Sequence, residues 1–219
     1  MAGGVGLLAV IGMLAAAIVT ATPRERTSEL SLLTQIRNLR EVDPGRFYRS
    51  AQLEGDQFAE AIERLGIRSI VNLRGKPTTP VEWYEQEIAV SERLGVRHFD
   101  VRLSARSVPR RAELLALLKV YEIAERPILV HCQDGADRAG EASAIYAIDE
   151  MGFSNDEALE LLTPRFLHFR WFRPAKRYFI ERYRGRRWAR REYDPCDFEY
   201  YDVARYCAAK NPEGSVSGL

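Results

Sequence analysis

The 219-residue chain has little net charge, few cysteines and no internal repeat. Its formal net charge is +1, and no nucleic-acid-binding motif accompanies the basic residues, so we do not expect a nucleic-acid partner. No motif predicts a metal site or a cofactor. Because 46% of the residues are hydrophobic and no segment recurs, the chain can bury one core, which predicts one domain with terminal extensions.

The N-terminal residues 1–23 lack charged side chains, and 5–21 form an almost wholly apolar run that is near the length needed to cross a bilayer. This composition predicts a transmembrane anchor or a signal peptide. Val19, Thr20 and Ala21 have the small-residue spacing of a cleavage site, but no Lys or Arg precedes the run. A retained helix would make the protein membrane-associated, with the domain in the cytoplasm by the positive-inside rule. A cleaved segment would place the domain outside.

Toward the other end of the chain, residues 164–193 hold eleven Lys or Arg and two acids, interleaved with aromatic side chains. The pattern suits a surface for anionic lipid headgroups, or packing against the domain with a solvated basic face. Farther on, Cys196 and Cys207 could pair in an oxidising compartment or stay free in the cytosol, and the sequence leaves both alternatives open. Residues 208–219 read as a disordered tail.

Short apolar runs alternate with amphipathic segments between residues 46 and 151. The runs predict strands, and the segments predict helices. Such alternation implies an α/β fold with a mainly parallel central sheet, helices on both faces, and ligands at the carboxyl ends of the strands. We assign 24–45 to a linker, 46–184 to the central domain and 185–219 to a basic, then disordered extension. The expected strands are 46–50, 67–74, 96–103 and 127–131, and the expected helices are 57–65, 83–94, 109–125 and 142–148.

The most informative segment, 131–140, reads His-Cys-Gln-Asp-Gly-Ala-Asp-Arg-Ala-Gly and joins the last expected strand to the next helix. In a tight loop that enters a helix, backbone amides point inward and the helix dipole adds positive potential, so this loop can bind a phosphate dianion. Gly135 removes a Cβ where the chain must turn sharply. Arg138 offers a planar fork of donors that matches two phosphate oxygens.

The thiol of Cys132 lies in the same electropositive field, which favours a reactive thiolate. Thiolate attack on phosphorus would form a phosphocysteine, which water would hydrolyse. The alternative, in which Cys132 only packs in the core and Arg138 is solvated, leaves their spacing and the glycine between them unexplained. The residues expected around the nucleophile are Gln133, Asp134, Gly135, Ala136 and Ala139 as the phosphate-binding loop, with His131 in support.

Together, His131, Cys132 and Arg138 match the signature of the cysteine-dependent phosphatase superfamily, which is His-Cys, five residues and Arg. The chain most resembles the bacterial dual-specificity branch, since 47–52 (Phe-Tyr-Arg-Ser-Ala-Gln) and 70–74 (Ile-Val-Asn-Leu-Arg) are similar to its entry strand and second core strand. The resemblance implies a protein-tyrosine-phosphatase-like fold over the central domain and a phosphomonoester hydrolase. Its substrate would be phosphotyrosine or another phosphoprotein, or a phosphoinositide-type phospholipid. Periplasmic members of that branch favour export of the domain.

Three positions depart from that family's pattern. Many relatives carry Ser or Thr where this chain has Ala139, and that hydroxyl stabilises the sulfur as it leaves phosphorus. Relatives carry an aspartic general acid on the loop after the third strand, whereas 103–108 has no carboxylate. Glu141 stands in the first helical turn, where relatives mostly have an uncharged residue and where the helix dipole tolerates a carboxylate. The first two departures leave a phosphate-binding pseudophosphatase as the alternative function.

A leaving alkoxide needs a proton, so an enzyme with this loop must take it from another side chain. The motif Cys-x-Asp-Gly-x-Asp-Arg is similar to the loop of the myotubularin-type lipid phosphatases, and this resemblance nominates Asp137 first and Asp134 second. Asp137 could instead pair with a neighbouring arginine and only order the loop. Asp100, within an expected strand, is a third candidate. The loop aspartates, the basic C-terminal region and the apolar N-terminus favour a phospholipid substrate and contact with a membrane, whereas the overall resemblance to the dual-specificity branch favours a phosphoprotein.

Overall fold

The computed structural model describes residues 37–207, and its centre is a five-stranded sheet. The strands are β1 (Arg40–Asp43), β2 (Phe47–Ser50), β3 (Ser69–Asn72), β4 (Arg97–Asp100) and β5 (Ile128–His131). Their order across the sheet is β1-β2-β5-β3-β4, with β2, β5, β3 and β4 parallel and β1 antiparallel to β2 at one edge. The predicted mainly parallel sheet is therefore confirmed.

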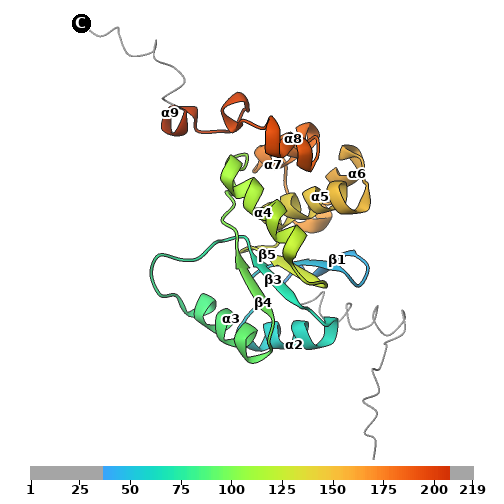
Figure 1. Cartoon of the computed structure of the whole chain (residues 1–219), viewed down its shortest axis with the longest axis vertical. Coiled ribbons are helices and arrows are strands. Elements are labelled where there is room, and N and C mark those ends of the chain that lie inside the picture. Colours follow the sequence, from blue (N-terminus) through green and yellow to red (C-terminus); the bar gives the residue numbers. More distant parts are fainter. Residues whose placement is uncertain (1–36, 208–219) are drawn as a thin grey trace, which may run out of the picture.

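Helices cover both faces of this sheet, as the prediction requires (Figure 1). α2 (Gly55–Leu65) and α3 (Glu82–Arg93) lie on one face. α4 (Arg111–Ile123) and α5 (Asp137–Met151) lie on the other, together with the helices that follow. Those helices are α6 (Asn155–Leu159), η1 (Pro164–Phe166), α7 (Pro174–Arg182), α8 (Arg186–Arg191), η2 (Pro195–Asp197) and α9 (Val203–Tyr206).

The central strands are buried on both faces, because successive side chains of a strand point to opposite sides. Ile70 and Leu129 join Phe58 of α2 in one core, and Val71 and Val130 join the larger core that includes α4 and α5. The parallel strands β2, β5 and β3 end at one edge of the sheet. The segments that follow them therefore meet at that edge, and the loop after β5 is one of them.

The edge strand β1 lies inside the expected linker 24–45, so that boundary is wrong for its last residues. The strand reads Arg-Glu-Val-Asp, and all four residues are half-buried. One apolar residue in four gives no hydrophobic periodicity, so the sequence carries no signal for this strand.

The domain also extends past residue 184, which corrects the expected extension 185–219 for its described part. Trp188 and Tyr193 belong to the larger core, and their ring centroids are 5.1 Å apart. The Tyr193 hydroxyl donates a hydrogen bond to the backbone carbonyl of Pro109, just before α4. Aromatic packing therefore holds α8 and the segment after it on the domain. The predicted tail 208–219 lies outside the described residues.

Basic side chains of the C-terminal region largely face acids or carbonyls of the domain. Arg186 pairs with Glu150, and Arg190 pairs with Glu122 of α4. Arg177 donates to the backbone carbonyls of Leu159 and Leu162 at 3.1 and 3.0 Å. These contacts agree with the packing alternative for this part of the basic region.

Cys196 and Cys207, whose pairing the sequence left open, form a disulfide with their Cα atoms 6.0 Å apart. The bond closes the segment that carries α9. No helix within residues 37–207 is long and apolar enough to cross a bilayer. The apolar residues 1–23, expected as an anchor or a signal peptide, lie outside the described part of the chain.

Replacing Trp188 tests whether α8 belongs to the domain. Trp188→Ala removes a ring that is 9% exposed and packed in the larger core, so we expect the free energy of unfolding to fall by about 3 kcal/mol or more. Urea unfolding followed by circular dichroism measures the change. Trp171→Ala is the matched control, because Trp171 is 71% exposed and its loss should leave the transition in place. Equal midpoints for the two variants would show that the domain ends before α8.

Candidate active site

Loop 132–138 begins at the carboxyl end of β5 and runs into the first turn of α5. β5 lies between β2 and β3, so the start of the loop is held on both sides. The amide of Cys132 donates to the carbonyl of Ser50 at 3.4 Å, and the amide of Gln52 donates to the carbonyl of Gln133 at 3.1 Å. The loop therefore continues the pairing of β5 with β2 before it turns away.

Gly135 makes the sharp turn of this loop possible, as its place in the sequence predicted. Its φ is +66°, in the left-handed region that side chains disfavour. A Cβ at this position would lie 2.5 Å from the amide nitrogen of Ala51 and 2.6 Å from the carbonyl carbon of Ser50. Any other residue would push the loop away from β2.

The guanidinium of Arg49, fully buried in β2, sets the direction of the peptide groups in the loop. It donates to the carbonyls of Gly135 at 2.7 Å and Ala136 at 2.9 Å. Since the N–H of a trans peptide points opposite to its carbonyl, the amides of Ala136 and Asp137 point away from Arg49. Burial lowers the pKa of Arg49 to about 10, which leaves the side chain charged at neutral pH. Sequence reasoning missed this role, although an arginine inside a buried strand was a signal.

Cys132 is a free cysteine, buried at 3% exposure beneath the loop. Arg49 and Arg74 lie close enough to Cys132 to interact with it electrostatically. Burial lowers the pKa of both arginines, and a negative charge on Cys132 acts in the opposite direction and raises it. Ala139 is fully buried in the same core cluster as Cys132 and brings no hydroxyl to the sulfur. The structure thus places the thiol near two cations, Arg49 and Arg74, that the sequence analysis did not name.

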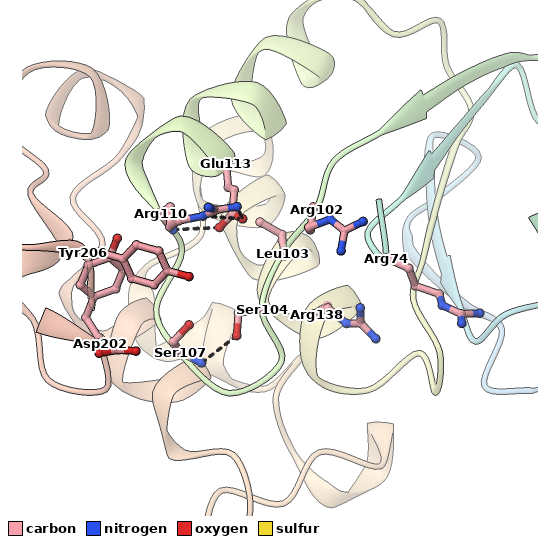
Figure 2. A pocket seen from close by; sticks show the side chains of 11 residues that line it. Arg74, Arg102, Leu103, Ser104, Ser107, Arg110, Glu113, Arg138, Asp202 and Tyr206 are labelled. Carbon is pink, nitrogen blue, oxygen red and sulfur yellow. Dashed lines mark hydrogen bonds and ion pairs between the residues drawn. The ribbon is translucent and has the colours of Figure 1, made fainter. Parts of the chain in front are cut away.

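Beside the loop, Arg138 lines a cavity of about 330 Å³ (Figure 2). Arg74 and Arg102 approach the cavity from the ends of β3 and β4, on the same side as Arg138. The segment closed by the disulfide forms the opposite wall (Figure 2). The other lining residues are Leu103, Ser104, Ser107, Arg110, Glu113, Tyr201, Asp202 and Tyr206.

The cavity wall from the loop after β4 holds no carboxylate, in line with the sequence of 103–108. Glu113 of α4 and Asp202 before α9 bring carboxylates to the cavity instead. Glu113 accepts hydrogen bonds from Arg110 at 2.5 and 2.9 Å (Figure 2). Sequence reasoning missed both acids, because neither lies near the loop motif and only the fold brings them there.

Asp137, the first nominee for the general acid, turns its carboxylate toward the segment before α7. Its Oδ1 lies 2.8 Å from Nδ1 of the buried His168, and its Oδ2 lies 3.6 Å from Nε of Arg173. The contact with Arg173 is the one expected if Asp137 pairs with an arginine and only orders the loop. The contact with His168 was not predicted from the sequence. Asp134 is exposed. Asp100 accepts hydrogen bonds from Asn72 at 2.8 Å and Tyr84 at 2.7 Å.

A buried carboxylate, Glu87 of α3, holds His131 behind the loop. Glu87 Oε1 lies 2.8 Å from Nε2 of His131 and 2.7 Å from Nε2 of His98, and Oε2 accepts from Gln52 at 2.8 Å. Burial alone raises the pKa of Glu87, but attraction and hydrogen bonding from His131, with hydrogen bonds from His98 and Gln52, lower it to about 2. Sequence reasoning assigned a supporting role to His131 but did not find its partner.

Glu141, the unusual carboxylate of the first helical turn, is fully buried and pairs with Lys176 at 2.8 Å. Burial raises the pKa of Glu141 to about 7, although Lys176 acts in the opposite direction. Lys176 also donates to the carbonyl of Ser107 at 2.7 Å. The pair therefore ties α5 and α7 to the loop that forms one wall of the cavity.

No group of His, Cys, Asp and Glu side chains within residues 37–207 is arranged to hold a metal ion. The structure brings together the thiol of Cys132, the guanidinium groups near it, and the amides of Ala136 and Asp137, which point away from Arg49. Such a set can bind an anion, stabilise charge that develops on it, and attack it.

Comparisons with known proteins agree with this geometry. Residues 36–177 match a family model described as the DSP-PTPase phosphatase domain of Swiss Army Knife proteins (PTP-SAK). No curated protein sequence matches the chain. The segment from residue 178 to the disulfide lies beyond the family match.

Among solved structures, TpbA from P. aeruginosa in complex with pTyr is 23% identical, with a TM-score of 0.55 over 68% of this chain and 86% of that chain. The core catalytic domain of the PP-IP phosphatase SIW14 from S. cerevisiae, in complex with citrate, is 26% identical. Its TM-score is 0.53 over 67% of this chain and 85% of that chain. These similarities agree with the protein-tyrosine-phosphatase-like fold; a myotubularin-like relative is not among them.

Replacing Glu87 tests the network behind the loop. A carboxyl group whose pKa is about 2 in the folded state and about 4.3 when unfolded stabilises the fold above pH 4.3, and this contribution disappears as pH falls through 2. We therefore expect Glu87→Gln to lower the free energy of unfolding at pH 7 by about 3 kcal/mol. The difference from the wild type should shrink between pH 4.5 and pH 2. Urea titrations across that range measure it.

Glu92→Gln is the matched control for Glu87→Gln, because Glu92 lies on the same helix and is exposed. It should follow the wild type at every pH. A constant difference between Glu87→Gln and the wild type down to pH 2 would contradict the role given to the ionised carboxylate.

Proposed function

The chain belongs to the DSP-PTPase phosphatase family, and we propose that it hydrolyses phosphomonoesters with Cys132 as the nucleophile. The observation that carries the proposal is the free thiol of Cys132 at the start of a loop that ends in Arg138 and enters a helix. The thiolate attacks phosphorus, an S–P bond forms, and the bond to the leaving oxygen breaks. Water then attacks phosphorus, the S–P bond breaks, and inorganic phosphate leaves.

In this mechanism Arg138 and the amides of the loop hold the phosphoryl oxygens while charge builds up on them. Arg49 does not touch the phosphate. It positions the loop by binding the carbonyls of Gly135 and Ala136, so that their partner amides face the substrate. His131 anchors the strand end through Glu87.

The proton for the leaving group is the step that departs from the family pattern. The contacts of Asp137 with His168 and Arg173 support a positioning role for its carboxylate, in which it fixes the first turn of α5. Glu113 and Asp202 line the cavity next to Arg138, which supports them as candidates for the general acid.

For the substrate, two classes suggested by the sequence stay in competition. TpbA binds phosphotyrosine in its solved complex, which supports an aryl phosphate, and SIW14 is a PP-IP phosphatase, which supports a phosphorylated inositol or its lipid. The cavity beside Arg138 also holds Arg74, Arg102 and Arg110. Glu113 balances the charge of Arg110, so the guanidinium groups of Arg74 and Arg102 are the ones that favour a substrate with negative charge in addition to the transferred phosphate.

Replacing Cys132 tests the proposed mechanism. We expect Cys132→Ser to abolish hydrolysis of p-nitrophenyl phosphate, because a hydroxyl is a far weaker nucleophile, while binding of vanadate or another phosphate mimic persists. Arg138→Lys keeps the charge but loses the bidentate fork, so the rate should fall by about two to three orders of magnitude. Steady-state release of nitrophenol measures both.

Unchanged hydrolysis by Cys132→Ser would exclude the covalent mechanism. Pre-steady-state measurement on the wild type addresses the pseudophosphatase alternative, which Ala139 motivates. One nitrophenol released per chain, with no further turnover, would favour that alternative.

Replacing Asp137 distinguishes a positioning residue from a general acid. If Asp137 only orders the loop, Asp137→Asn should slow an alkyl phosphate and an activated aryl phosphate by the same factor, because protonation of the leaving group is unaffected. Glu113→Gln and Asp202→Asn are measured in parallel. A much larger loss on the alkyl substrate identifies the acid, and finding it for Asp137→Asn would overturn the positioning role.

A further inference from the structure

The segment that joins η1 to α7 exposes a cluster of large apolar side chains. Trp171 is 71% exposed, Phe172 70%, Leu167 53% and Phe169 40%. These four lie within six residues and are half of the large hydrophobic side chains that are exposed in the described chain. Scattered apolar residues on a surface need no explanation, but a cluster of this kind marks an interaction site. We call residues 165–172 the aromatic loop.

Positive charge surrounds this cluster, and negative charge is absent from its sequence neighbourhood. Arg165 and Arg170 are exposed within the aromatic loop. No Asp or Glu occurs between Glu160 and Glu181 in the sequence. Within residues 37–207, neither Arg165 nor Arg170 forms an ion pair, in contrast to Arg186 and Arg190, which pair with acids of the domain.

The aromatic loop is attached directly to the candidate active site. The carbonyl of Phe166 accepts a hydrogen bond at 3.2 Å from the side-chain amide of Asn38, which also donates to the carbonyl of Gly135 at 3.1 Å. The guanidinium of Arg49 stacks on the Phe166 ring at 4.9 Å. His168 contacts Asp137. A partner bound by the aromatic loop would therefore lie next to loop 132–138.

We propose that the aromatic loop docks the protein on an anionic phospholipid bilayer. Aromatic and aliphatic side chains that alternate with arginines along one irregular segment suit the membrane interface, where rings enter the acyl boundary and guanidinium groups stay with the headgroup phosphates. Because residues 161–180 contain no Asp or Glu, the side chains of this segment add no repulsion of their own toward anionic headgroups. Membrane docking by the aromatic loop does not require catalysis, so it can be tested separately from the phosphatase mechanism.

The experiment uses the whole chain and vesicles of phosphatidylcholine with or without phosphatidylglycerol. We expect Trp171 emission to shift to shorter wavelength, and to be quenched by brominated acyl chains, when anionic vesicles are added. Trp171→Phe should lose most of this signal while still sedimenting with the vesicles. Trp171→Ala combined with Phe172→Ala should weaken vesicle binding by about tenfold or more.

Charge and surface controls complete the test. Arg165→Gln and Arg170→Gln should each weaken binding to anionic vesicles by about fivefold, and binding to neutral vesicles should change little. The matched control is Ile123→Ala, an apolar residue that is 40% exposed at the end of α4. All variants keep the same N-terminal segment, so differences between them report on the aromatic loop.

Equal vesicle binding by the wild type and the Trp171→Ala/Phe172→Ala variant would overturn the proposal. So would a Trp171 emission shift that follows protein concentration without lipid, since that outcome assigns the aromatic loop to a second copy of the chain. Hydrolysis of p-nitrophenyl phosphate in the absence of lipid should be the same for all these variants.

Discussion

The site depends on one buried interaction, the hydrogen bonds from Arg49 to the backbone carbonyls of loop 132–138. A tight loop with several amides turned to one side must turn the matching carbonyls to the other side, where each needs a donor. Arg49 supplies that donor from within the sheet, and a third bond reaches Leu161 before η1. Removing Arg49 would leave the carbonyl of Gly135 with Asn38 as its donor and the carbonyl of Ala136 with the amide of Gly140, and the loop would lose its charged anchor in the sheet.

Two further buried charge pairs enclose the loop and explain why the domain keeps ionised groups in its interior. Glu87 holds His131 from the face covered by α2 and α3, and Lys176 with Glu141 holds the wall at Ser107 from the opposite face. Replacing a whole buried pair by apolar residues often costs little stability, whereas removing one partner leaves the other charge unpaired and is costly. These pairs also have a geometric role, since each one fixes a segment beside loop 132–138 or its cavity from an element remote in sequence.

Much of the fold was predictable, because the parallel strands β2, β3 and β5 are apolar runs buried on both faces and flanked by amphipathic helices. The failures came from elements without a hydrophobic signal of their own. β1 is a half-buried edge strand with one apolar residue, and α8 is a run of arginines around Trp188. In both cases the segment takes its structure by pairing with, or packing against, the rest of the domain. The hydrophobic periodicity of the segment itself therefore does not predict that structure.

The sequence by itself determined the loop that holds Cys132, Gly135 and Arg138, because these residues are close in the chain and their geometry follows from one strand, one turn and one helix. The tertiary structure alone decided what surrounds it. Glu87, Glu113, Asp202 and the disulfide-closed segment reach the site from distant parts of the chain, and Asp137 found its partners in His168 and Arg173. Local spacing encodes contacts within a loop, whereas contacts between remote segments exist only after the core has brought them together.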